Sequence, residues 1–365
     1  MKKTLIALAV LGAAAGVAHA QSNVTIYGIV DTGFIKESGS DIKMGENVNN
    51  RIGFRGVEDL GSGQKATFEL EKRFELADGT LKESNGYNKA DGKTTDWDGA
   101  ANVGLKGDNW GAVRLGRVNE LTTESIRKFD PFYQYGVASM FLSKQRSARI
   151  SNTVRYDSLN WSGFHFGASY SLGGNTNKDS IKGAMIAVDQ AGADNDGYAI
   201  SLGYDNGPLS LAGNWSRLAD SNKSYTWNLG AAYKFGPARV SLAYENTKNK
   251  GWKLGDESAA NAAAGMALGE QSKQQNWLLG LEWTLGPGRL NASVNYNQIK
   301  DVASWNDNKD NLKYAIGYTY NLSKRTSIYG NVAYTDYDDE QAAGYYGYKG
   351  RDSVTGVQVG ITHKF

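Results

Sequence analysis

The chain has 365 residues, and its 40 basic residues almost balance its 38 acidic ones, unlike the strongly basic balance of nucleic-acid-binding proteins. The sequence contains no cysteine, which excludes a disulfide scaffold and a thiolate metal site. Of its three histidines, only His165 and His363 lie beyond the first twenty residues, too few for a histidine-based metal cluster. Mean hydropathy is −0.50, and no apolar run beyond the first twenty residues is long enough for a membrane-spanning helix. We expect no metal and no other cofactor.

Residues 1–20 have the pattern of a secretory signal peptide. Lys2 and Lys3 precede an apolar stretch, and Ala18-His19-Ala20 matches the small-residue site that a signal peptidase cuts. We expect the mature chain to begin at Gln21 and residues 21–365 to form one domain. Without the two lysines, the formal net charge falls from +2 to zero.

From residue 21 onward, apolar residues alternate with polar or small ones. The last segment, Val354 to Phe365, shows this pattern clearly, because successive side chains of a strand point to opposite faces. One face carries Val357, Val359, Ile361, His363 and Phe365. The alternation recurs about sixteen times, with no helical segment to cover the apolar faces. The sequence therefore predicts an all-β protein.

The predicted connections alternate between short and long. Short turns are expected at residues 58–63, 107–111, 157–163, 205–208, 235–238, 286–288 and 321–325. Longer connections are expected near residues 36–48, 76–96, 120–147, 172–196, 218–223, 248–274, 301–309 and 337–352. Seven short and eight long connections separate sixteen antiparallel strands and place all the short turns at one end of the sheet.

In many predicted strands, the row of alternating apolar residues ends in an aromatic residue. This position indicates which environment covers the apolar faces. Amphipathic rings favour the headgroup region of a bilayer, so two aromatic bands suit a wall that faces lipid. A β-barrel is the membrane architecture open to so polar a chain, because only alternate residues need to face lipid. A soluble β-sandwich is the less favoured alternative. We predict a 16-stranded antiparallel transmembrane β-barrel.

Several motifs resemble those of the general porins of Gram-negative bacteria, of the Neisseria and Burkholderia type. They read VTIYGIVD, RIGFRGVEDLGSG, GAVRLGR, NTVRYDS, YDNGPLSL, YNLSKRTSIYGNVAY and TGVQVGITHKF, and the resemblance covers residues 21–365. It implies an outer-membrane barrel with short periplasmic turns, long extracellular loops and a third loop folded into the pore. It also implies a homotrimer, contact with membrane lipid and lipopolysaccharide, and an assembly machinery that recognises the terminal Phe365.

The long connection at residues 120–147 carries more apolar surface than a loop in water would use. Its aromatic residues include Phe129, Phe132 and Phe141, which a loop packed against the inner wall would bury. An external cap or a latch between subunits is the alternative. If this loop lies inside, its acidic residues could face basic residues of the wall. These acidic residues are Glu120, Glu124 and Asp130.

Strand parity predicts which arginines point into the lumen. They are Arg51, Arg55, Arg73, Arg114, Arg149 and Arg155, whereas parity leaves the direction of Arg117 open. Opposed charges across a water-filled constriction would create a transverse field that selects polar solutes. Residues 98–101 read DGAA, where the resembled family often has an arginine, and this departure argues against strong anion selectivity.

Catalysis finds little support in the sequence. His165 and His363 are the histidines outside the predicted signal peptide, and neither falls in a recognisable catalytic motif. We predict that the protein is not an enzyme but a channel for passive diffusion of small hydrophilic solutes, with no nucleic-acid partner. A substrate-specific channel and a structural or adhesive barrel remain the alternatives. The sequence leaves the preferred solute and the sign of ion selectivity open.

Overall fold

The computed structural model describes residues 23–81, 97–143, 148–172, 196–217, 224–250, 271–348 and 350–365. The predicted signal peptide lies outside the described residues, as do parts of five of the long connections and residue 349. Among the described residues, no helix is long and apolar enough to cross a membrane.

The described residues form seventeen strands, of which sixteen make the wall. These are β1 (Asn23–Glu37), β3 (Arg51–Gly61), β4 (Gln64–Arg73), β5 (Ala100–Gly107), β6 (Gly111–Asn119), β7 (Arg149–Asp157), β8 (Phe164–Ser171), β9 (Gly197–Asn206), β10 (Leu209–Arg217), β11 (Tyr225–Phe235), β12 (Ala238–Lys250), β13 (Gln271–Leu285), β14 (Gly288–Lys300), β15 (Lys309–Asn321), β16 (Thr326–Asp336) and β17 (Ser353–Lys364). The three-residue strand β2 (Lys43–Gly45) pairs beside β1 within the first long connection.

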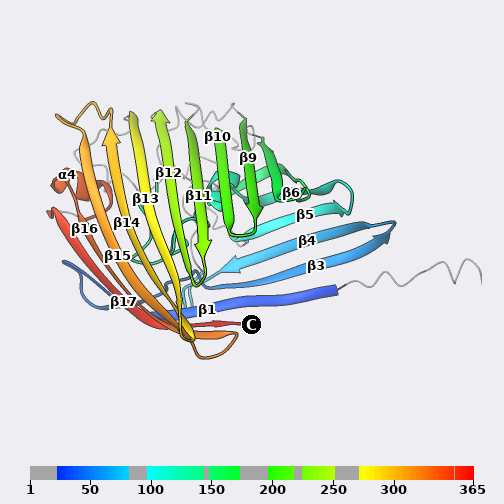
Figure 1. The fold of residues 1–365 in the computed structure, drawn as a ribbon, viewed down its shortest axis with the longest axis horizontal. Helices are drawn as coiled ribbons and strands as arrows, with labels where there is room; N and C mark the ends of the chain where they lie inside the picture. Colours follow the sequence, from blue (N-terminus) through cyan, green and yellow to red (C-terminus); the bar gives the residue numbers. More distant parts are fainter. Residues whose placement is uncertain are drawn as a thin grey trace, which may run out of the picture.

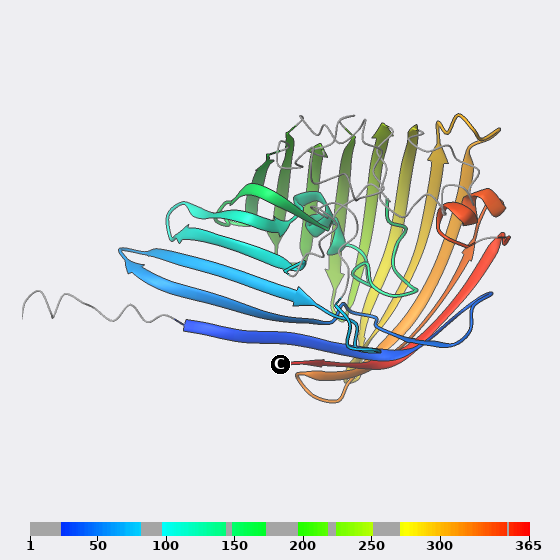
Figure 2. The ribbon, with the colours of Figure 1, turned by 180° about the vertical axis from the view of Figure 1, so that it is seen from behind.

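The wall closes because β1 pairs with strands on both of its sides. Its first half runs antiparallel to β3, from Asn23 opposite Val57. Its second half runs antiparallel to β17, up to Glu37 opposite Gly356. Every other wall strand pairs with its neighbours in sequence order, so the sheet curves round on itself (Figures 1 and 2). The predicted 16-stranded antiparallel barrel is confirmed.

In the wall, apolar side chains are exposed on the outside and polar side chains are buried on the inside, the reverse of a water-soluble protein. On the outer face, Leu229 and Leu279 are 53% and 50% exposed. On the inner face of the same strands, Asn228 and Asn276 are 0% and 1% exposed. This alternation follows from the period of two in a strand, and it provides a lipid-facing surface without any long apolar run.

The connections alternate as predicted, with seven short turns and eight long joins between wall strands. Gly61 and Gly63 have φ of 83° and 74° in the first short turn, a conformation that glycine adopts without strain. In the described parts of the long connections lie two short helices, α2 (Leu121–Arg127) and α4 (Glu340–Tyr345). The sequence pattern predicted neither helix, because the alternation of the strands dominates it.

The chain end completes the seam between β1 and β17. The backbone N–H of Gly28 donates to the Phe365 carbonyl at 3.0 Å, and that of Phe365 donates to the Gly28 carbonyl at 3.1 Å. A Cβ atom on Gly28 would collide with the Phe365 ring and lie 2.7 Å from the Arg51 carbonyl oxygen. Glycine at position 28 therefore lets the terminal ring lie against the outer face of β1.

We expect Gly28→Ala to destabilise this seam by about 1–3 kcal/mol, the usual cost of overpacking. Unfolding of the refolded barrel in urea, followed by its heat-sensitive migration in detergent gels, measures the change. Gly330→Ala is a matched control, because a Cβ atom there would make only an ordinary 3.7 Å contact with Val359. Equal stability of the two variants would contradict the role assigned to Gly28.

Candidate functional site

The connection between β6 and β7 runs along the inner face of the barrel, and we call residues 121–143 the inserted segment. It begins with α2, which packs against β9, β10 and β11. Its side chains Ile126, Phe129 and Met140 are buried against the wall. The wall residues in this cluster are Ala212, Ala232, Ala243 and Leu278. A side chain on Gly230 would collide with the Phe129 ring, so small inward residues make room for the segment.

Polar side chains of the wall hold the backbone of the inserted segment. Ser241 on β12 donates a hydrogen bond of 2.7 Å to the Phe129 carbonyl. Asn276 on β13 donates one of 3.2 Å to the Phe141 carbonyl. Buried backbone groups need such partners, since an unpaired one loses its hydration without compensation. The segment is therefore fixed to the wall by hydrogen bonds as well as by apolar packing.

Asp130 organises the bend of the inserted segment, and the basic wall residue near it is Lys313 on β15, not one of the predicted arginines. Its fully buried carboxylate accepts backbone N–H bonds from Phe132, Gln134 and Met140 at 3.0, 2.9 and 3.0 Å. Burial raises the pKa of Asp130, against the opposing effect of these bonds and of nearby Lys313. The sequence could not reveal this role, because it depends on the path of the loop.

The other two acidic residues of this connection have different roles. Glu120 caps α2, because its Oε2 accepts the N–H of Thr123 at 2.7 Å, while its buried Oε1 has no hydrogen-bond partner among the described residues. Glu124 does meet a wall arginine, because its Oε2 lies 2.5 Å from Arg155 Nη1. Burial raises the pKa of Glu124, but the charge of Arg155 and the hydrogen bonds from Asn119 and Arg155 together outweigh burial, and the net shift is downward. This ion pair fastens α2 to β7.

Three of the predicted inward arginines gather around one carboxylate, Glu71, and we call these four residues the Glu71 cluster. Arg73 Nη2 lies 3.2 Å from Glu71 Oε1, and Arg149 Nη2 lies 3.7 Å from the same oxygen. Arg51 Nη1 lies 3.8 Å from Glu71 Oε2. Sequence reasoning did not single out Glu71, although its position two residues before Arg73 gives it the same strand parity.

The inserted segment approaches the Glu71 cluster through Tyr135 and Arg127. Arg51 Nη2 donates to the Tyr135 hydroxyl at 3.5 Å, and the Arg127 guanidinium lies 5.7 Å from the Tyr135 ring centroid. Burial raises the pKa of Tyr135, but Arg51 and Arg127 outweigh it and hold that pKa below its ordinary value. Strand parity could not have found either residue, because both lie outside the strands.

Arg117 and Asp98 lie next to this cluster. A β-bulge between Gly116 and Val118 removes the regular parity at Arg117, whose Nε donates to the Asp98 carbonyl at 2.8 Å. The Asp98 carboxylate accepts the backbone N–H of Arg73 at 3.0 Å. Burial raises the pKa of Asp98, with Arg73 opposing that shift.

The remaining predicted arginines are not among the four residues of the Glu71 cluster. The Arg55 guanidinium lies 5.1 Å from the ring centroid of Tyr27, whose hydroxyl donates to Glu71 Oε2 at 3.3 Å. Arg114 Nη2 lies 2.5 Å from Asp157 Oδ2, and Arg155 Nη2 lies 2.6 Å from Asp157 Oδ1. Arg114 and Arg155 are thus neutralised by Asp157 and Glu124, whereas the Glu71 cluster has more cations than anions.

The two histidines do not come together. His165 Nε2 on β8 lies 3.7 Å from Asp205 Oδ2, and His363 Nδ1 on β17 lies 2.9 Å from the Thr326 hydroxyl. Within the described ranges, no group of three or more His, Cys, Asp or Glu side chains is arranged to hold a metal ion.

We expect Asp130→Asn to loosen the inserted segment without opening the barrel. The amide provides one acceptor oxygen in place of two, and each buried N–H left without a partner costs about 1–3 kcal/mol. Limited trypsin digestion in detergent, read at Arg127 and Lys128, should cut the variant faster than the parent. Asp41→Asn, at an exposed position, is the control, and unchanged digestion of the Asp130 variant would contradict the assigned role.

Comparison with known proteins gives consistent matches over the chain. The family model for Gram-negative porins matches residues 7–340. An outer membrane porin protein of Bordetella pertussis is 32% identical over an alignment 408 positions long, which covers 100% of both chains. Outer membrane porin protein 32 of Delftia acidovorans is 34% identical over 395 aligned residues, again covering 100% of both.

A solved structure, described as an anion-selective porin from Comamonas acidovorans, superposes with a TM-score of 0.71. It is 28% identical to this chain, and the match covers 94% of this chain and 100% of the other. The barrel is closed, its outer face is apolar as a lipid-facing surface requires, and the matches cover the full length of the relatives. Together these observations assign the family. The chain belongs to the family of Gram-negative porins and is a channel protein of the outer membrane.

Proposed function

We propose that this porin is a diffusion channel for small hydrophilic solutes that prefers anions at low salt. A surplus of arginine where the inserted segment approaches the β3–β7 wall carries the proposal. The cations are Arg51, Arg73, Arg117, Arg127 and Arg149, and the anions are Glu71 and Asp98. Counted over the described residues alone, five positive charges here exceed two negative ones by three.

The physical basis of this preference is the field that unbalanced charges produce in a narrow aqueous passage. Low-dielectric walls focus such a field, which raises the local concentration of ions of the opposite sign. The DGAA sequence at residues 98–101, which lacks the arginine often found there in the family, argued against strong anion selectivity. The surplus offsets that argument, because other positions provide the arginines. The anion selectivity stated for the Comamonas acidovorans porin agrees with this proposal.

A substrate-specific channel is the second candidate. Such a channel would guide its solute along a row of exposed aromatic side chains in the lumen. The inner aromatic residues Phe141, Tyr337 and Tyr345 favour it less, because they are buried in packing contacts and not open to a passing solute. A saturable current at increasing solute concentration would distinguish a specific channel from passive diffusion.

The porin's partners also belong to the proposal. The fold matches porins, including an OmpT structure from Vibrio cholerae described as a trimer form, which is 12% identical and shows fold similarity alone. We infer a homotrimer for this chain, and mass measurement in mild detergent tests it. We also infer that the assembly machinery recognises Phe365, so deleting this residue should reduce the amount of folded protein in the outer membrane.

We expect Arg149→Ala to shift the zero-current potential in a salt gradient towards cation preference. Unit charges about 4 Å apart in water interact by about 1 kcal/mol, which corresponds to roughly a fivefold change in the anion-to-cation permeability ratio. Arg55→Ala is the control, because it removes the same charge from a wall site outside the Glu71 cluster. The shift should shrink at high salt, where the Debye length falls to about 3 Å at 1 M.

Planar-bilayer recording at about 0.1 M and 1 M salt provides the measurement. An unchanged zero-current potential for Arg149→Ala at low salt, in a channel that still conducts, would refute the assigned selectivity site. An equal shift for both variants would mean that total lumen charge, and not the Glu71 cluster, sets the preference.

A further inference from the structure

One carboxylate, that of Glu245 on β12, lies within a row of asparagine side chains on the inner face of the wall. The row crosses six neighbouring strands, and each member lies directly opposite the next in the strand pairing. Its side chains are all buried, with at most 6% exposure. We call this row the amide ladder, and from β10 to β15 it consists of Asn214, Asn228, Glu245, Asn276, Asn297 and Asn311.

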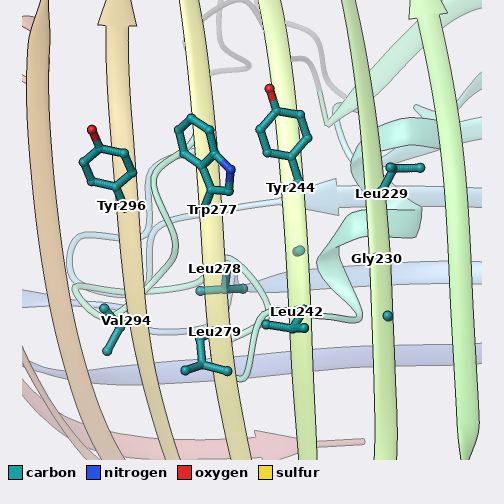
Figure 3. A pocket seen from close by; sticks show the side chains of 11 residues that line it. Leu229, Gly230, Leu242, Tyr244, Trp277, Leu278, Leu279, Val294 and Tyr296 are labelled. Atoms are coloured by element: carbon teal, nitrogen blue, oxygen red, sulfur yellow. The ribbon is translucent and has the colours of Figure 1, made fainter.

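The outer side of the same strands shows that the amide ladder points inward. In Figure 3, Tyr244, Trp277 and Tyr296 form a row on the outer face of β12, β13 and β14, where they lie directly opposite one another. Each of these aromatic residues is next to a ladder residue in the chain. Neighbouring side chains of a strand point to opposite faces. The ladder therefore lies behind the aromatic row, on the side of the inserted segment.

Both ladder neighbours of Glu245 donate hydrogen bonds to it. Asn228 Nδ2 donates to Glu245 Oε2 at 3.3 Å, and Asn276 Nδ2 donates to Glu245 Oε1 at 3.5 Å. A carboxylate has only acceptor oxygens, so each neighbouring amide must turn its NH₂ group toward Glu245. The carboxylate thus sets the orientation of two side chains on two other strands.

The same direction continues along both branches of the ladder. Asn214 Nδ2 donates to Asn228 Oδ1 at 2.6 Å. Asn297 Nδ2 donates to Asn276 Oδ1 at 2.6 Å, and Asn311 Nδ2 donates to Asn297 Oδ1 at 2.8 Å. An amide that presents its NH₂ group on one side presents its oxygen on the other, so each orientation fixes the next. All five hydrogen bonds therefore run toward the carboxylate, and bonds in such a chain polarise one another.

The two amides next to Glu245 also hold the inserted segment. Asn228 Nδ2 donates at 3.2 Å to the Thr122 carbonyl, at the start of the segment. Asn276 Nδ2 donates at 3.2 Å to the Phe141 carbonyl, near its end. In each case, the nitrogen that faces Glu245 is the one that reaches the segment. An amide turned over would place its oxygen against a carbonyl oxygen, so both of its bonds would be lost.

We propose that Glu245 is a positioning residue of the channel, whose carboxylate holds both ends of the inserted segment through the orientation of Asn228 and Asn276. This role goes beyond the proposed diffusion function, because it concerns where the segment lies and not which ions pass. Glu245 is not a member of the Glu71 cluster. The ion preference and the positioning role can therefore fail separately.

Glu245→Gln tests this role in the full-length porin in detergent, with a side chain of almost the same shape. A glutamine amide has one oxygen and one NH₂ group, so one neighbouring amide must turn over and release its end of the segment. Hydrogen–deuterium exchange, read by mass spectrometry, should become about tenfold faster in residues 121–127 or in residues 139–143. Fluctuations of the open-channel current should increase as well. The control is Glu69→Gln, which removes the same charge from β4, outside the ladder, and should leave both exchange rates unchanged.

Moving the carboxylate by one position along the ladder separates the two ends of the segment. Glu245→Gln combined with Asn228→Asp keeps the net charge, and the remaining amides can all donate toward position 228. Asn276 then keeps its orientation, so exchange should become faster in residues 121–127 alone. Glu245→Gln combined with Asn276→Asp should have the reverse effect, with faster exchange in residues 139–143 alone.

Four results would overturn the proposal. The first is exchange at the parent rate at both ends in Glu245→Gln, in a barrel that keeps its heat-sensitive gel migration. The second is an equal acceleration in the Glu69→Gln control, which would assign the effect to the loss of any inner charge. The third is faster exchange at the same end in both relocated variants, because amide orientation would then not hold the segment. The fourth is faster exchange with unchanged current fluctuations, which would limit Glu245 to a role in the fold.

Discussion

Closure of the backbone hydrogen-bond ladder is the constraint on which the rest of this structure depends. A wall strand in lipid has no water to satisfy its N–H and C=O groups, so no edge can stay unpaired. The chain meets this requirement where β1 pairs with both β3 and β17. The last residue takes part, because Phe365 exchanges two backbone hydrogen bonds with Gly28. Every other feature is arranged on one side or the other of the closed wall.

The inner side resembles a second core, formed between the wall and the inserted segment. Small wall residues such as Gly230 and Ala243 leave the space that Phe129 and its neighbours fill. Ser241 and Asn276 provide the hydrogen bonds that the loop backbone would otherwise obtain from water. Packing and polar contacts therefore hold the segment along β9–β17, and the Glu124–Arg155 pair fastens α2 to β7. The β3–β7 wall carries the Glu71 cluster.

Charged side chains on the inner side of the wall are arranged in two ways. Inside, Arg155 and Glu124 form a close pair that holds α2, whereas Arg149 and its neighbours share a single carboxylate at longer distances. The charges of the first arrangement cancel, so its role is structural. In the second, cations outnumber anions among the described residues, and this surplus is the basis of the proposed anion preference.

The sequence by itself determined the barrel, its strand number, and the alternation of short and long connections. Period-two hydrophobicity is a local property, and a strand keeps it whatever its neighbours are. It also predicted Arg51, Arg73 and Arg149 as inward residues, because parity applies within a regular strand. The tertiary structure alone decided the partners of these residues: Glu120 caps a helix, Asp130 binds loop backbone, and Tyr135 meets Arg51. Those contacts join residues far apart in sequence or within irregular backbone, where no periodicity relates position to direction.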